Sequence, residues 1–377
     1  MNKRLLNSAI AFATMALLIA CSDDDNKIEP TPTAPAPSTP TSKGAYVLSS
    51  GYWGENNASI QYIDLENHRV INDDMYFYAN GEKLGDSGQD LLLYGSKLYC
   101  TVSTSEKVVI MDKSCKVLKS HSLYVDTDIL PNDIIIDSDP RYLAAHNGKV
   151  YFTSYDGTVS RIDTATLEIE AKVNIGNVPE AITVANDKLY VNLSNYGSGN
   201  RVAVIDIATF TKIKEIRVAL NPYSTCFTGS DGYVYVISNG NYAGDASIPE
   251  SEWVYSTLQR IYPNTDMITE EWPATFACQY GDDIYAIYSE YYLPETHKCV
   301  KYNLVNKGET DFIDLDEFKF DGYSCANSIN VNPANGDAYV CCTPWGQYGV
   351  VKVFNKQGDC QQEYTVGYCP SKVIFTE

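Results

Sequence analysis

The sequence predicts an all-β fold, a seven-bladed β-propeller closed by its own C-terminal strand. Three observations support this prediction. From residue 44 to residue 377 the chain consists of short β-rich runs separated by turns of Gly, Asn and Asp, without a helical period over any long window. A two-strand motif recurs along these runs. Incomplete copies of the motif stand at the two ends of this region.

The recurring motif has a tyrosine in the second strand of each unit. One copy begins at Pro179, reaches this tyrosine at Tyr190 and ends at Asp206, and another runs from Pro140 through Tyr151. Successive tyrosines of this kind lie 39 to 54 residues apart, a spacing typical of propeller blades rather than of helical repeats. The seven tyrosines that predict seven blades are Tyr46, Tyr99, Tyr151, Tyr190, Tyr235, Tyr285 and Tyr339.

The two ends of the repeat region complement each other. Residues 369–376 match the first strand of a unit, with no second strand after them, whereas residues 44–47 match a second strand with no first strand before them. We therefore expect the C-terminal strand to complete the first blade. Closure of this kind removes the exposed sheet edges that an open ring would leave.

The composition limits the function. The chain has 28 Lys+Arg against 48 Asp+Glu, a net charge of −20, which argues against a nucleic-acid partner because phosphate binding needs clustered cations. We expect no cofactor and no metal site, since the four histidines show no ligand spacing. A calcium site remains an alternative at an acidic cluster, although the cluster lacks the glycine and terminal glutamate of a calcium loop. The cluster consists of Asp126, Asp128, Asp133, Asp137 and Asp139.

Thirty of the 45 aromatic residues are tyrosines, and many lie in the loops expected on one propeller face. Aromatic side chains supply contact area at a low entropic cost, and their polar tips donate hydrogen bonds. They predict a binding surface, although they could instead pack the seams between blades and brace the loops. The longest insertions, residues 239–255 and 288–297, would form a raised wall. The candidate ligand-binding residues are Tyr52, Trp53, Tyr155, Tyr196, Tyr242, Trp253, Tyr291, Tyr292, Trp345 and Tyr348.

The first twenty residues predict a secretory signal peptide. Lys3 and Arg4 precede an apolar run that is too short for a comfortable membrane span. Residues 18–21, which end in Cys21, resemble the lipobox of bacterial lipoproteins. This resemblance implies that Cys21 is acylated and holds the protein at a membrane; the alternative is a plain signal peptide that is cut elsewhere, with Cys21 unmodified.

Residues 21–43 predict a tether between the lipidated cysteine and the propeller. The acidic run at residues 22–26 resembles the export signal of Bacteroidetes lipoproteins, which implies display on the outer face of the outer membrane. A solvated charged spacer is the alternative. The five prolines of residues 27–43 favour extended polyproline II structure.

Ten cysteines remain besides Cys21, and an even number in an exported chain favours disulfides. Cys341 and Cys342 are adjacent on a predicted strand, so their side chains should point to opposite faces. Buried free thiols are the alternative to disulfides. The plausible pairs within single blades are Cys100 with Cys115, Cys278 with Cys299, and Cys342 with Cys360.

The motif, with its Lys-Leu-Tyr-Val and Val-Ile-Asp segments at residues 188–191 and 204–206, resembles that of YncE-like and surface-layer-type propellers. The segment from Tyr46 to Tyr62 resembles the start of a Bacteroidetes lipoprotein family that includes BtuG-type proteins, which capture cobamides. The resemblance implies a surface lipoprotein that binds a nutrient, first of all a corrinoid such as vitamin B12. It also implies a partner, a TonB-dependent outer-membrane transporter.

Two other functions stay open. One is a carbohydrate-binding propeller lipoprotein of a glycan-uptake system, since the flat faces of sugars also stack on Tyr and Trp. The other is an enzyme on the same face, a lyase or a hydrolase. Nothing among the 48 acidic residues singles out a catalytic carboxylate pair, so we expect a binding protein rather than an enzyme.

Overall fold

A computed structural model describes residue 40 and residues 43–124, 138–176, 178–320 and 323–376. The predicted signal peptide, Cys21 and nearly all of the predicted tether lie outside the described residues and stay predictions. Among the residues that are described, no helix is long and apolar enough to cross a membrane.

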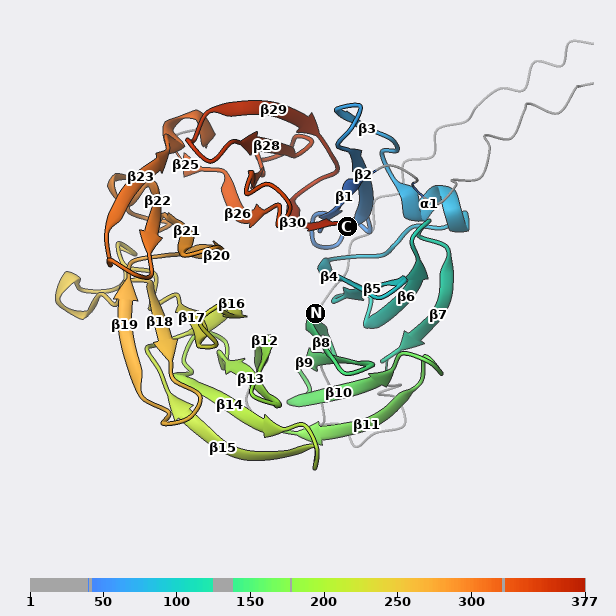
Figure 1. Cartoon of the computed structure of the whole chain (residues 1–377), viewed down its shortest axis with the longest axis horizontal. Helices are drawn as coiled ribbons and strands as arrows, with labels where there is room; N and C mark the ends of the chain where they lie inside the picture. The colour runs from blue at the N-terminus through green and yellow to red at the C-terminus, as the bar shows by residue number, and fades with distance from the viewer. Residues whose placement is uncertain (1–39, 41–42, 125–137, 177, 321–322, 377) are drawn as a thin grey trace, which may run out of the picture. The chain divides into compact units, whose positions relative to one another are not determined.

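Seven four-stranded antiparallel sheets surround a central axis, which confirms the predicted seven-bladed propeller (Figure 1). The strands of each blade are given from the axis outward, and the first two blades are β30 (Pro370–Phe375), β1 (Gly44–Ser49), β2 (Ser59–Asp64) and β3 (Arg69–Val70); and β4 (Gly88–Tyr94), β5 (Lys97–Val102), β6 (Lys107–Asp112) and β7 (Val117–Ser122). The third and fourth blades are β8 (Pro140–His146), β9 (Lys149–Ser154), β10 (Thr158–Asp163) and β11 (Ile169–Asn174); and β12 (Pro179–Ala185), β13 (Lys188–Leu193), β14 (Arg201–Asp206) and β15 (Thr211–Arg217). The last three blades are β16 (Pro222–Thr228), β17 (Val234–Ser238), β18 (Thr257–Ile261) and β19 (Ile268–Trp272); β20 (Phe276–Tyr280), β21 (Asp283–Tyr288), β22 (Lys298–Asn303) and β23 (Glu309–Ile313); and β26 (Ala326–Val331), β27 (Ala338–Cys342), β28 (Val350–Phe354) and β29 (Cys360–Thr365).

The remaining elements are short and lie in connections between these strands. They are α1 (Met75–Asn80), the 3-10 turns η2 (Glu250–Glu252), η3 (Pro294–Thr296) and η4 (Leu315–Phe318), and the small hairpin of β24 (Lys319–Phe320) and β25 (Tyr323–Ser324).

The C-terminal strand closes the ring as predicted. Strand β30 pairs antiparallel with β1, so that Phe375 faces Ala45 and Val373 faces Val47. Every residue of β1 is buried, because β30 and β2 pair with its two edges and its side chains pack against the blades on either side. The first blade is therefore assembled from the two ends of the repeat region.

The core lies between adjacent blades and contains the seven strand tyrosines. Each of these tyrosines occupies the second strand of a different blade and is at most 3% exposed. The middle strands are covered on both faces, which explains their continuous apolar runs, as in the Val-Ala-Val-Ile segment of β14. The outermost strand β11 instead alternates between half-buried and exposed residues, the pattern of a strand with one solvated face.

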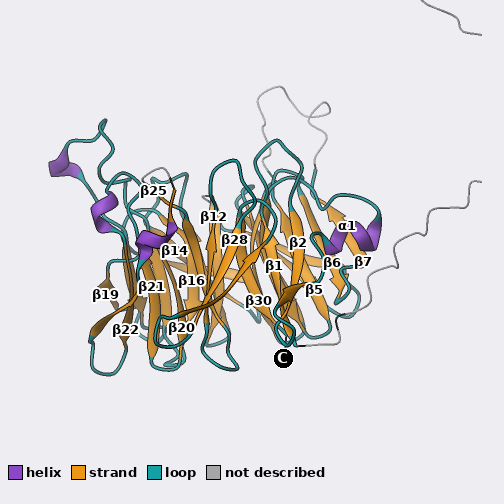
Figure 2. Cartoon of the chain, turned by 90° about the horizontal axis from the view of Figure 1, so that it is seen from above, coloured by secondary structure: helices purple, strands orange, loops and turns teal. Residues whose placement is uncertain are grey.

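Strand direction sorts the connections onto two faces. The loops that follow each second strand, together with the loops that join one blade to the next, lie on one side, here called the loop face (Figure 2). The C-terminus lies on the opposite side. The insertions at residues 239–256 and 289–297 come from adjacent blades of the loop face, as predicted.

The one disulfide among the described residues joins Cys325 to Cys342, so the predicted pairing of Cys342 with Cys360 is wrong. Strand pairing explains the difference. Ala326 lies opposite Cys342 across β26 and β27, which brings the two disulfide Cα atoms to 4.9 Å. Cys360 instead begins the outermost strand, opposite Phe354, and is exposed.

The other two predicted disulfides are also wrong, because their four cysteines are free thiols. Cys278 lies on β20 and Cys299 on β22, with β21 between them. Cys341 is a buried thiol in a different core cluster from Cys342, which confirms that these neighbours point to opposite faces.

Candidate ligand-binding face

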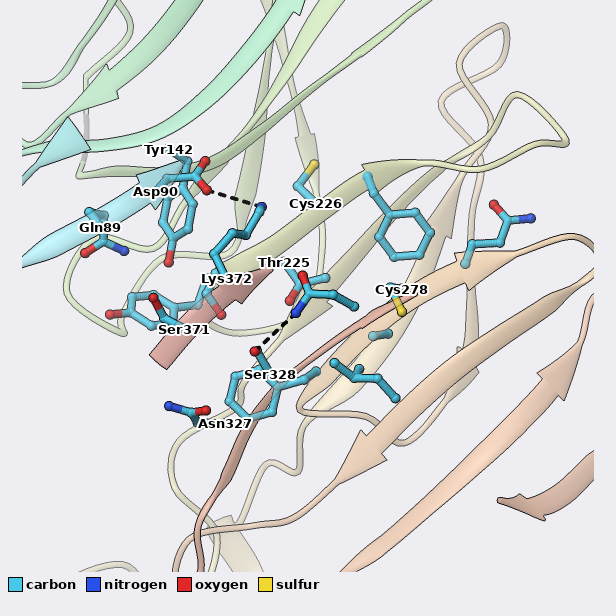
Figure 3. Close-up of a pocket in the computed structure, with 18 of the residues that line it drawn as sticks. Gln89, Asp90, Tyr142, Thr225, Cys226, Cys278, Asn327, Ser328, Ser371 and Lys372 are labelled. Carbon is cyan, nitrogen blue, oxygen red and sulfur yellow. Dashed lines mark hydrogen bonds and ion pairs between the residues drawn. The ribbon is translucent and has the colours of Figure 1, made fainter. Parts of the chain in front are cut away.

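A cavity of about 550 Å³ lies on the propeller axis, and the innermost strands supply its wall (Figure 3). Its volume falls in the range of small-molecule sites. One ion pair lies at this wall, between Asp90 and Lys372 at 3.2 Å. Most of the other polar groups are uncharged hydroxyls and amides, including those of Gln89, Thr225, Gln279, Asn327, Ser328 and Ser371.

Bulges at the start of the inner strands turn side chains towards the axis. Four of these strands begin with a proline, a residue that lacks an N–H for the sheet ladder and suits the first position of a strand. The strand register shifts directly afterwards, and a bulge of this kind changes the direction of the side chains it contains. The bulged residues of six inner strands are Gln89, Arg141 with Tyr142, Glu180 with Ala181, Tyr223 to Thr225, Asn327, and Ser371.

Two of these bulged residues form a buried ion pair. The Arg141 Nε donates to Glu180 Oε2 at 2.9 Å, and the two side chains are 10% and 1% exposed. The Arg141 guanidinium also donates to Gln89 Oε1 at 2.6 Å and lies over the ring of Tyr155 at 4.5 Å. Gln89 lines the axial cavity, so this network fixes part of the cavity wall.

Burial and the neighbouring charges act in opposite directions on the pKa values of the two groups. Burial is the largest single effect on the pKa of Arg141 and lowers it, but the Glu180 carboxylate and three neighbouring tyrosines together outweigh burial and hold this pKa well above its usual range. Burial raises the pKa of Glu180, whereas the guanidinium and the Tyr155 hydroxyl, which donates to Glu180 Oε1 at 2.6 Å, oppose that rise. The same burial raises the pKa of Tyr155.

Three predicted residues meet in one aromatic cluster on the loop face. The ring of Tyr52 lies 5.3 Å from Trp345 and 5.5 Å from Tyr368, and Tyr348 stacks on Tyr368 at 4.6 Å. The Gly346 N–H donates to the Tyr52 hydroxyl at 2.8 Å, which joins the first and last blades. Trp345 remains 78% exposed and Tyr348 59% exposed, so the cluster offers rings to a ligand.

A second group of predicted residues lies in the raised wall. Tyr242 and Tyr291 line a cavity of about 240 Å³, and Tyr292 contacts Tyr291 edge to face at 4.9 Å. The two insertions pack together at Gly244, where φ is +92° and a Cβ would lie 2.7 Å from Leu293. Trp253 lines a neighbouring cavity of about 810 Å³.

The remaining predicted residues lie apart from these groups. Tyr155 contacts Tyr196 edge to face at 5.6 Å, beside the buried ion pair, and Tyr196 is exposed. Trp53 projects into solvent from a loop that is braced by a hydrogen bond from the Gly54 N–H to Asp86. The ten residues therefore share the loop face without converging on one pocket.

The ten candidate residues do not include the polar residues of these bulges. Arg141, Glu180, Tyr223 and Ser371 each directly follow the proline that opens an inner strand. A comparison of equivalent positions in successive motif copies could have paired Arg141 with Glu180, because these positions lie in neighbouring blades.

No group of three metal-ligating side chains occurs in the part of the chain that the structure describes. Of the acidic cluster considered for calcium, Asp126, Asp128, Asp133 and Asp137 lie outside the described residues.

Comparison with known proteins assigns the chain to a family. The model of the family described as "Domain of unknown function (DUF5074)" matches residues 43–376, the whole propeller. The chain belongs to the DUF5074 family. The search of curated proteins found no match to this chain.

Solved structures share the fold of this DUF5074 protein. Hydrazine synthase from Kuenenia stuttgartiensis is 15% identical with a TM-score of 0.52, over 70% of this chain and 74% of that one. The computationally designed protein Ika8 is 11% identical with a TM-score of 0.51, over 86% of this chain and 88% of its own. At such low identity, the likeness shows the propeller architecture alone.

Proposed function

We propose that this DUF5074 protein binds a broad nutrient ligand across its loop face, and that the ligand is a corrinoid. The observation that supports this proposal most directly is the pairing of a polar axial cavity with the exposed ring cluster of Trp345 and Tyr348. A corrinoid is wide, has apolar ring edges and carries amide arms. Its edges would pack on the rings, while its amides would exchange hydrogen bonds with the amides and hydroxyls of the cavity wall.

The proposal includes a place of action. An acylated Cys21 would anchor the protein at the outer membrane, and the proline-rich tether would hold the propeller at the cell surface. There the propeller would pass its ligand to a TonB-dependent outer-membrane transporter. Labelling of intact cells with a membrane-impermeant reagent tests the surface position, and Cys21→Ala should release the protein from the membrane.

A binding function suits the carboxylates near the axis better than catalysis does. Asp90 accepts hydrogen bonds from the N–H groups of Leu91 at 3.0 Å and Leu143 at 2.9 Å. Glu180 is engaged by Arg141 and Tyr155. Carboxylates held by several donors brace a wall, whereas a general acid or base must exchange its proton with a substrate.

A carbohydrate is the second candidate ligand. The stacked rings of Tyr348 and Tyr368 offer a platform for the flat face of a sugar, and the hydroxyls and amides of the axial cavity could hold its hydroxyl groups. Calorimetric titration with cyanocobalamin and with a panel of oligosaccharides separates the two candidates, since each predicts heat with its own ligand.

The double substitution Trp345→Ala and Tyr348→Ala should weaken ligand binding about tenfold or more, because exposed aromatic anchors carry much of the energy of a binding surface. Both side chains are largely exposed, so the unfolding midpoint should change little. Val305→Ala, on the opposite face and 76% exposed, is the matched control and should leave affinity unchanged. Equal affinity of the double variant and the parent would place the ligand elsewhere.

A further inference from the structure

The cavity of about 240 Å³ in the raised wall differs in chemistry from the axial cavity. It lies between the last three blades along the chain, and its polar lining combines one carboxylate, that of Glu290, with amides, hydroxyls and His297. No Lys or Arg is among the described residues that line it. An acceptor-rich cavity without a fixed cation favours a positively charged guest.

The carboxylate of Glu290 is buried at 3% exposure. One of its oxygens accepts the Ser256 N–H at 2.6 Å, and the Tyr288 hydroxyl also bonds to the group. These contacts fix the carboxylate at the cavity wall, and neither donor is a cation. A buried, unneutralised carboxylate is stabilised by a cation placed beside it.

Two further acceptors at this cavity lack a partner. The carboxamide oxygens of Asn239 and Asn327 are buried, and neither has a hydrogen-bond partner within the described part of the chain. The Asn327 amide nitrogen is already used, since it donates to Thr343 Oγ1 at 2.9 Å. Buried acceptors of this kind are costly unless a ligand or water donates to them.

The rings of Tyr242 and Tyr291 complete the wall. The face of an aromatic ring attracts a cation, and most strongly where water is excluded. The space corresponds to about eight water molecules, enough for a small organic group.

We propose that this cavity binds the primary ammonium group of an organic ligand. Its three N–H donors match three acceptors at the wall, the Glu290 carboxylate and the carboxamide oxygens of Asn239 and Asn327. The tyrosine rings contact the carbon atoms next to the charge. This inference is independent of the corrinoid, because it concerns a different cavity and a different chemical class.

The test compares three small probes by ligand-observed NMR titration of the whole protein in phosphate buffer, which contains no amine. The probes are n-propylammonium, tetramethylammonium and 1-propanol. These probes separate the effect of charge from that of N–H donation. Tetramethylammonium is charged but has no N–H group, and 1-propanol has neither the charge nor an ammonium group. We expect n-propylammonium to bind about tenfold more tightly than the other two.

The substitution Glu290→Gln removes the charge and keeps an oxygen that can accept the Ser256 N–H. It should weaken n-propylammonium binding about tenfold or more and leave 1-propanol unchanged. Glu295→Gln, an exposed carboxylate of the same insertion, makes the same change in charge and should have no effect. If Glu290→Gln does not fold, Asn239→Ala is tested in its place and should likewise weaken n-propylammonium binding. Equal binding of all three probes, or unchanged binding in the folded variant, would overturn the proposal.

Discussion

A chain that ends at Cys369 is expected to lose its cooperative fold. This truncation removes β30 and leaves the edge of β1 open, although Tyr46, Val47 and Leu48 are fully buried in the intact ring. An uncovered edge pairs readily with other chains, so the expected product is an aggregating protein without a sharp urea transition. Circular dichroism and size-exclusion chromatography measure both properties.

A synthetic peptide of residues 368–377 supplies the matched control for this truncation. Added in excess, it should restore a folded monomer by pairing with β1, whereas a scrambled peptide of the same composition should not. A truncated chain that unfolds cooperatively at the parent's urea midpoint would contradict the closure.

Arg141→Met should destabilise the protein by about 3–5 kcal/mol, because it leaves the Glu180 carboxylate buried beside no cation. The loss should be largest above the ordinary pKa of a glutamate and should diminish in acid, where the isolated carboxylate takes up a proton. The double variant Arg141→Met with Glu180→Met should recover most of the lost stability, since no buried charge remains. Urea unfolding of the three proteins measures the effect.

An exposed ion pair provides the control for this comparison. Lys119 and Glu168 lie 2.8 Å apart, but both side chains are well exposed, so Lys119→Met should cost less than about 1 kcal/mol. A similar small loss for Arg141→Met would mean that the buried pair does not brace the axial wall.

The repeat made most of the fold predictable. Each motif tyrosine lies in the core, on the second strand of a blade, because a repeated motif produces the same packing environment in every unit. The closing strand was also predictable, since residues 369–376 lacked a second strand after them.

The polar lining of the cavities was harder to predict, because it depends on bulges rather than on side-chain alternation. Asn327 lines two cavities because one extra residue in β26 shifts its register. Cys325 pairs with Cys342 because Ala326 lies opposite Cys342 across β26 and β27, and spacing within the sequence could not reveal this pairing. The loop aromatics share one face, as predicted, but their grouping depends on contacts between blades that a single sequence does not encode in a simple pattern.

The central proposal, that the loop face binds a corrinoid, is tested most directly by retention of a coloured ligand. The purified protein is incubated with cyanocobalamin and desalted, and the corrinoid absorbance of the protein fraction is compared with its concentration. We predict a red protein with about one corrinoid per chain, and less retained corrinoid per chain for the Trp345→Ala and Tyr348→Ala double variant. A colourless parent protein that also gives no calorimetric heat with cyanocobalamin would contradict the proposal.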